Sequence, residues 1–236
     1  MKRGYDYGPF HIQAELERID IQVGHGTIAR VIARNGLAWP KRTRQETIYQ
    51  RVEPRKLGEI AIDLKYYRAF QEPGESGSGT HGKPLNKGLG KEYLFMAIEQ
   101  KSRLAYARVY TRMTADNAQA FLRDATAYYA SVGITSRSVK TDNGKCFTAK
   151  LFESTCSELM LKHDRIRPAR PQDNGKAERV IRTFNEIWGS LPYPNSETRN
   201  DNLPNQLNYY NLQRRHRSLG GLTPMESVNN LLGAYN

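Results

Sequence analysis

The fold is decided by the stretch Glu59-Ile60-Ala61-Ile62-Asp63-Leu64-Lys65-Tyr66-Tyr67, in which apolar and polar residues alternate. Alternation with a period of two predicts a β-strand that buries one face. Asp63 lies between Ile62 and Leu64, and a carboxylate inside a strand is costly to bury unless something pairs with it. Asp63 is therefore either an acid satisfied at a sheet edge or part of a functional site.

Further predicted strands and helices follow this stretch. Patterning predicts strands at 93–99, 104–110, 138–141 and 162–166, and helices that start at the cap residue Thr114 and over 148–159 and 175–188. Three strands are joined directly, and helices and strands then take turns. This order predicts an α/β fold with a mixed five-stranded sheet flanked by helices.

The N-terminal part has a different pattern. Two apolar stripes at helical spacing, separated by a break at 20–26, predict two short helices, and Asn35-Gly36 ends the second. This pair is either a helix-turn-helix or a helical hairpin that packs on the rest. In a helix-turn-helix, Arg30 and Arg34 of the second helix are DNA-binding candidates.

The chain is predicted to have four parts. They are a helix-turn-helix DNA-binding segment at 1–40, a basic linker at 41–57, a core at 58–190 and a C-terminal helical tail at 191–236. Within the core, 72–91 contains runs of glycine and is predicted to be a mobile loop. This loop is either a plain surface linker or a segment that becomes ordered on DNA.

Charge and composition narrow the class of partner. The 236 residues include 36 Lys and Arg against 24 Asp and Glu, which gives a net charge of +12. A surplus of this size favours nucleic acid as the partner. Two cysteines are too few for a disulfide framework, and we find neither an apolar run that would span a bilayer nor a secretory signal. We therefore expect a cytoplasmic protein that has no membrane partner.

Two further acids stand in positions like that of Asp63. Asp142 directly follows the strand at 138–141, where open α/β sheets place their sites, and Gly144 permits a tight turn after it. Glu178 lies near the start of the helix at 175–188. Alone, Asp142 is explained as a turn residue and Glu178 as an acid favoured by the helix dipole. Together, three acids from two strands and a helix are suited to hold two Mg²⁺ ions.

Three blocks of sequence resemble the integrase core of bacterial insertion-sequence transposases. The blocks are Gly58 to Asp63, Thr141 to Gly144 and Arg167 to Arg179, and the run Tyr209 to Pro224 resembles the tail signature of that family. The family belongs to the aspartate-aspartate-glutamate superfamily, which has a ribonuclease-H-like fold and is related to retroviral integrases. The resemblance extends over about residues 9 to 225.

The resemblance implies roles for individual residues. Asp63, Asp142 and Glu178 match the catalytic, metal-binding triad, with Mg²⁺ or Mn²⁺ as the cofactor and two ions expected. Asn174 lies one helical turn before Glu178 and Arg182 one turn after it, so both are expected to face the same groove. Lys176 and Arg179 add positive charge to this helix. The expected DNA-binding set is therefore Arg30, Arg34, Asn174, Lys176, Arg179 and Arg182.

The function implied is that of a DNA transposase. It would cleave phosphodiester bonds at element ends with the help of metal ions, and then join the freed 3′-hydroxyl to target DNA. We expect double-stranded DNA as partner, a homo-oligomer on that DNA, and a bacterial, nucleoid-associated location. The alternative is a truncated, non-catalytic repressor that only binds element ends. A ribonuclease acting on RNA–DNA hybrids shares the acids but leaves the helix-turn-helix unexplained.

Overall fold

A five-stranded mixed sheet forms the centre of the computed structural model, which describes residues 9–36, 56–71, 89–167 and 174–233. The strands are β1 (Glu59–Arg68), β2 (Lys91–Glu99), β3 (Ala105–Tyr110), β4 (Ser138–Thr141) and β5 (Lys162–Arg165). Their order in the sheet is β3-β2-β1-β4-β5. The first three strands form an antiparallel meander, while β4 pairs with β1 and β5 pairs with β4 in parallel.

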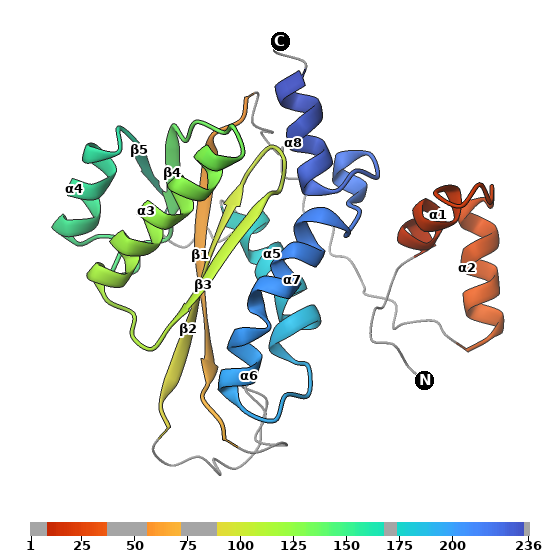
Figure 1. The fold of residues 1–236 in the computed structure, drawn as a ribbon, viewed down its shortest axis with the longest axis horizontal. Helices are drawn as coiled ribbons and strands as arrows, with labels where there is room; N and C mark the ends of the chain where they lie inside the picture. Colours follow the sequence, from red (N-terminus) through yellow and green to blue (C-terminus); the bar gives the residue numbers. More distant parts are fainter. Residues whose placement is uncertain (1–8, 37–55, 72–88, 168–173, 234–236) are drawn as a thin grey trace.

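The helices lie on both faces of this sheet and at one side of it (Figure 1). They are α1 (Pro9–Glu17), α2 (His25–Arg34), α3 (Ala115–Ser131), α4 (Lys150–Glu158), α5 (Gly175–Phe184), α6 (Ser196–Asp201), α7 (Leu203–Leu212) and α8 (Pro224–Gly233). Thr114 caps α3 as predicted, because its hydroxyl accepts a hydrogen bond of 3.2 Å from the backbone N–H of Asn117. The predicted α/β fold with two preceding helices is confirmed.

Alternation along the strands divides the core into two halves. On β2, Phe95 and Ala97 face α3 and α4, whereas Leu94, Met96 and Ile98 face α5 and α7. Each half is made of fully buried apolar side chains, so both faces of the central strands are covered. A polar side chain in the buried middle of β1 or β2 therefore lies under one of two defined helix layers.

The C-terminal helices are held to the sheet by a buried cation. The Arg199 side chain is only 1 % exposed and is paired with the carboxylate of Glu92 on β2. Its guanidinium lies 5.1–5.3 Å from the ring centroids of Tyr67, Phe70 and Trp188. This arrangement combines an ion pair with cation–π contacts in a desolvated position, so Arg199 joins α6 to the strands β1 and β2.

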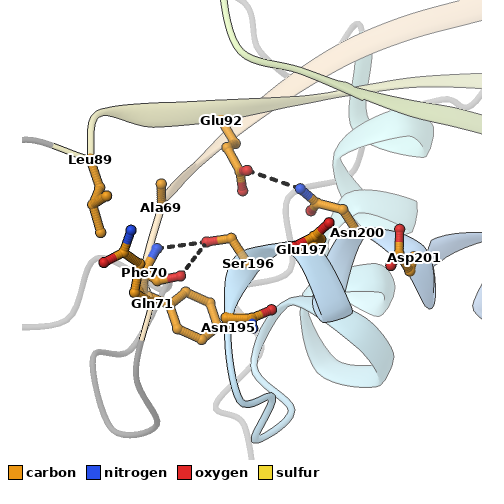
Figure 2. A pocket seen from close by; sticks show the side chains of 10 residues that line it. All are labelled: Ala69, Phe70, Gln71, Leu89, Glu92, Asn195, Ser196, Glu197, Asn200 and Asp201. Carbon is orange, nitrogen blue, oxygen red and sulfur yellow. Dashed lines mark hydrogen bonds between the residues drawn. The ribbon is translucent and has the colours of Figure 1, made fainter.

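Further contacts fix α6 beside the end of β1, at a cavity of about 590 Å³ (Figure 2). The backbone N–H of Phe70 donates to the hydroxyl of Ser196 at 2.6 Å, and that hydroxyl donates to the carbonyl of Phe70 at 3.1 Å. Asn200 donates to Glu92 at 2.9 Å. The tail is thus part of the folded core.

The N-terminal helices contact the segment that follows α7. Arg214 donates to Nε2 of His11 at 3.4 Å, and the guanidinium of Arg217 lies 6.0 Å from the ring centroid of Phe10. Within α2, Ile28 and Ile32 are buried, whereas Val31, which shares their predicted stripe, is 51 % exposed. These helices therefore bury a narrower apolar face than the sequence pattern predicts.

Some predicted elements lie outside the described residues, and others differ from the structure in their bounds. Most of the predicted linker and loop, at 41–55 and 72–88, lies outside the described residues, and β2 already begins at Lys91. The helix predicted over 175–188 is α-helical only to Phe184 and continues as a π-helical turn, Asn185–Gly189. Gly189 in this turn abuts the ring of Tyr67, where an added Cβ would come within 2.5 Å. No helix in the described ranges has both the length and the apolar composition needed to cross a bilayer.

Candidate active site

Asp63 lies in the middle of β1 and points toward the α5 side of the sheet. It pairs across the sheet with Met96, a residue of the core half that contains α5. Its carboxylate accepts a hydrogen bond of 2.8 Å from the backbone N–H of Leu64. Burial is the main reason that the pKa of Asp63 rises from 3.8 to about 6, and the negative charges of Asp142 and Glu178 raise it further. The charges of the other two acids thus act on Asp63.

Asp142 reaches this region through the parallel pairing of β1 with β4. The register pairs Ile60 with Val139 and Ala61 with Lys140. Continuing this register by two residues brings Asp142 level with Asp63 on the neighbouring strand. Neighbouring strands lie about 4.8 Å apart, so the two acids are close although they are far apart in sequence.

A tight turn sets the direction of the Asp142 side chain. Its carboxylate accepts a hydrogen bond of 2.9 Å from the backbone N–H of Gly144. A Cβ at position 144 would lie only 2.9 Å from that carboxylate oxygen. A larger residue at position 144 would therefore require the Asp142 carboxylate to shift, and the predicted tight turn after Asp142 is present.

Glu178 lies in the first turn of α5, and its side chain is exposed. The start of α5 is joined to β1 by Asn174, whose amide donates 3.2 Å to the carbonyl oxygen of Ile62. Ile62 directly precedes Asp63, so this hydrogen bond holds the start of α5, which carries Glu178, to the part of β1 that carries Asp63. The charge of Glu178 then contributes to the raised pKa of Asp63.

The donor set fits a divalent cation. Carboxylate oxygens are the ligands that Mg²⁺ and Mn²⁺ prefer, and a cation would relieve the repulsion that raises the pKa of Asp63. Within the ranges that the structure describes, no three His, Cys, Asp or Glu side chains already surround a point where an ion would bind. Coordination by all three acids therefore requires a rearrangement of side chains in the site, and the triad stays a prediction.

The six predicted DNA-binding residues have different environments. Asn174 is 4 % exposed and bonded to β1, and Lys176 donates 3.2 Å to the carbonyl oxygen of Gln100, in the turn between β2 and β3. Both side chains thus connect α5 to the core. Arg179 and Arg182 are exposed on α5, and Arg30 and Arg34 are exposed on α2. The contact of each with DNA is untested by the structure.

Sequence reasoning did not identify the two side-chain contacts of His163, one of which is with Thr141, the residue before Asp142. His163 of β5 is buried, its Nε2 lies 2.8 Å from the hydroxyl of Thr141, and its Nδ1 lies 3.0 Å from a carboxylate oxygen of Glu153. These contacts support the end of β4 immediately before Asp142. The sequence signal was limited to a histidine in a short predicted strand, because its partners come from β4 and α4.

Comparison with protein families agrees with this architecture. Two family models, both described as "Integrase core domain", match residues 75–171 and 159–224. The first match contains Asp142 and the second contains Glu178, whereas Asp63 lies before both.

Individual relatives are distant. The chain is 25 % identical over 201 residues to "Putative integrase ORF3" of Spiroplasma virus SpV1-C74, which covers 78 % of this chain and 51 % of the relative. It is 31 % identical over 87 residues to an Escherichia coli protein named transposase InsD for insertion element IS2, covering 36 % of this chain and 29 % of that one. The chain thus spans about half or less of the length of these relatives.

A solved structure supports the fold. The catalytic core domain of bovine immunodeficiency virus (BIV) integrase aligns with a TM-score of 0.50 and 22 % identity, over 75 % of this chain and 98 % of that one. At this level of identity the likeness establishes a shared ribonuclease-H-like fold.

Proposed function

We propose that this protein is a DNA transposase of the insertion-sequence type. The proposal is supported by the two integrase core domain models, which match residues 75–171 and 159–224. It cleaves phosphodiester bonds at the ends of an element, and the freed 3′-hydroxyl then attacks a phosphodiester bond of the target DNA and displaces the target's 3′-oxygen. Asp63, Asp142 and Glu178 are its catalytic residues and hold Mg²⁺ or Mn²⁺, with two ions when the site is filled. The observation that carries the proposal is the parallel register of β1 with β4, which brings Asp142 level with Asp63, together with the hydrogen bond of Asn174 that holds the start of α5 to β1.

The chemistry follows from the positions of the acids. Metal ions, when bound, activate the attacking oxygen and stabilise the leaving oxygen of an in-line displacement. The chain itself supplies a fixed acid on β1, held by the N–H of Leu64, and a second acid directed by the turn at Gly144. Glu178 comes from a helix and is exposed, so it is the acid that adjusts as the site forms.

Cationic residues divide into two proposed roles. Arg179 and Arg182 lie on the same helix as Glu178 and attract the phosphates of the strand to be cut, a contact that does not depend on sequence. Arg30 and Arg34 are exposed on α2, one turn apart, and are proposed to read the element ends as part of a helix-turn-helix at 1–40. The protein then works as a homo-oligomer on double-stranded DNA, at the bacterial nucleoid.

A strand-transfer assay with candidate element ends and Mg²⁺ tests the proposal. Asp63→Asn, Asp142→Asn and Glu178→Gln are each expected to lower strand transfer at least 100-fold while DNA binding stays within about threefold of the unmodified chain. Glu186→Gln is the matched control, because Glu186 is also exposed, two turns after Glu178 along the same helical segment. The control is expected to keep full activity.

The same assay separates the alternatives. End-specific binding without strand transfer by the unmodified chain would favour the non-catalytic repressor. Strand transfer that survives in all three variants would contradict the assignment of the acids. Cleavage of RNA–DNA hybrids without strand transfer into duplex DNA would favour the ribonuclease.

A further inference from the structure

The side chain of His163 on β5 is buried against α4, on the face of the sheet opposite to Asp63. It is 4 % exposed, its ring meets that of Phe152 edge to face at a centroid distance of 5.2 Å, and its Nδ1 lies 3.0 Å from a carboxylate oxygen of Glu153. Phe152 belongs to the core half that contains α3 and α4, whereas Asp63 lies on the α5 side. His163 therefore acts on the candidate active site only through other residues.

Thr141 connects His163 to Asp142. The Thr141 side chain is fully buried, and its hydroxyl donates a hydrogen bond of 2.8 Å to the backbone carbonyl oxygen of Asp142. A threonine hydroxyl has one proton, so in its contact of 2.8 Å with Nε2 of His163 the ring nitrogen is the donor. The proton on Nε2 thus commits the Thr141 hydroxyl to the carbonyl of Asp142.

Two further hydrogen bonds hold the turn that carries Asp142. The backbone N–H of Gly144 donates 2.9 Å to the Asp142 carboxylate, and the amide of Asn143 donates 3.0 Å to the carbonyl oxygen of Ile166, directly after β5. The Thr141 hydroxyl holds the carbonyl end of Asp142, and the N–H of Gly144 holds its carboxylate. Contacts within the protein therefore set the direction of this carboxylate.

We propose that His163 is a positioning residue for metal binding, which acts through the Thr141 hydroxyl to hold the Asp142 carboxylate toward Asp63. The inference rests on the proposed function, in which these acids share divalent ions. A ligand that is already oriented loses less conformational freedom when it binds an ion, and contacts that support a ligand in this way change metal affinity by about 10- to 100-fold. Loss of the hydroxyl therefore weakens metal binding, although the hydroxyl lies on the other face of the sheet.

Substitutions at position 141 separate this role from packing. Thr141→Val keeps the shape of the side chain and removes the hydroxyl, whereas Thr141→Ser keeps the hydroxyl. Thr155→Val is the matched control, because Thr155 on α4 is also fully buried and its hydroxyl makes hydrogen bonds to Gln119 and Leu151. Mn²⁺ binding by the full chain is titrated from the electron paramagnetic resonance signal of the free ion, at a temperature at which every variant is folded.

The hydroxyl at position 141 is expected to decide the affinity. We expect Thr141→Val to weaken Mn²⁺ binding by about tenfold or more, while Thr141→Ser and Thr155→Val bind within about threefold of the unmodified chain. Equal losses in Thr141→Val and Thr155→Val would overturn the proposal, because the effect would then be one of packing. Unchanged affinity in Thr141→Val would overturn it as well.

A double-mutant cycle tests whether His163 acts through Thr141. His163→Phe keeps a ring against Phe152 and removes the Nε2 donor. Alone, it is expected to weaken Mn²⁺ binding by up to the same factor as Thr141→Val, and it is expected to add nothing in the Thr141→Val background. Losses that multiply in the double variant would overturn the link, because His163 would then affect the site by another route.

Strand transfer over a range of Mg²⁺ concentrations separates this inference from the proposed function. Thr141→Val is expected to need about tenfold more Mg²⁺ for half-maximal strand transfer and to keep its maximal rate. Strand transfer with an unchanged Mg²⁺ requirement in Thr141→Val would overturn this inference alone. Mn²⁺ binding that requires Asp142 and Thr141, without strand transfer by the unmodified chain, would overturn the proposed function alone. Undiminished Mn²⁺ binding by Asp142→Asn would overturn both, because the ion would then be held elsewhere.

Discussion

The carboxyl group of Asp63 combines partial burial with two negative neighbours, which is unfavourable when no cation is bound. Its pKa is raised to about 6, mainly by burial and then by the charges of Asp142 and Glu178, while the N–H of Leu64 and the charge of Lys65 lower it. A structural role alone does not require such an arrangement. It is typical of sites where a bound ion or a proton completes the charge balance.

This pKa predicts how stability depends on pH in metal-free buffer. The pKa is above its ordinary value of 3.8 in the folded chain, so folding loses stability as the pH rises from about 4 to about 6, and the loss persists at pH 7. Asp63→Asn removes this loss and is expected to raise the free energy of unfolding at pH 7 by up to about 3 kcal/mol. Below pH 4 the two proteins are expected to unfold alike.

Thermal unfolding followed by circular dichroism from pH 3 to pH 8 measures this difference. Asp164→Asn serves as a control, because Asp164 is a strand acid paired with Lys162. A variant at position 63 that is no more stable than the unmodified chain at pH 7 would show that the charge of Asp63 is already compensated.

At the scale of single elements, the local sequence pattern predicts the helices and strands themselves better than it predicts the contacts between them. Local sequence patterns identify all five strands, and Thr114 correctly marks the start of α3, because these signals arise within a few residues. Tertiary contacts are less accessible to sequence reasoning. The hydrogen bonds of Asn174 to Ile62 and of Lys176 to Gln100 span 112 and 76 residues of the chain, and no local pattern indicates them.

In the candidate site, too, local patterns indicate individual residues but not how the fold brings them together. The sequence indicates the three acids as candidates from their local settings. The parallel register that brings Asp142 level with Asp63 depends on the pairing of β1 with β4, which the sequence pattern does not give. The support that His163 gives to Thr141 likewise depends on the order of strands in the sheet.

The second helix of the N-terminal pair carries the prediction for DNA specificity. Arg30 and Arg34 are one turn apart and exposed on α2, so both reach one groove. Arg30→Ala with Arg34→Ala is expected to reduce the preference for element ends over random DNA by at least tenfold, since base-edge contacts provide about 1–3 kcal/mol of discrimination each. Arg182→Ala is expected to weaken binding to both DNAs equally.

Competition titrations with labelled element ends and unlabelled random DNA measure this preference. Undiminished preference in the α2 variant would mean that α1 and α2 serve as a packing element against the tail, where Arg214 and Arg217 contact them.

At the scale of the whole molecule, distant segments are brought to one end of the sheet. β1 and β4 carry two acids, α5 carries the third, and the tail is fastened to β2 by the buried pair of Arg199 with Glu92. The N-terminal helices contact that tail through His11 and Phe10. The proposed function therefore requires that one DNA molecule reaches both the three acids and the exposed face of α2.

The central claim is that Asp63, Asp142 and Glu178 share divalent metal ions, and a crystal structure with Mn²⁺ tests it most directly. The anomalous signal of Mn²⁺ locates each ion independently of the protein model. We expect Mn²⁺ with oxygens of all three carboxylates within about 2.0–2.6 Å, and those carboxylates within about 4–8 Å of one another. Mn²⁺ bound elsewhere, or Glu178 still turned outward with the ion held by other residues, would contradict the account.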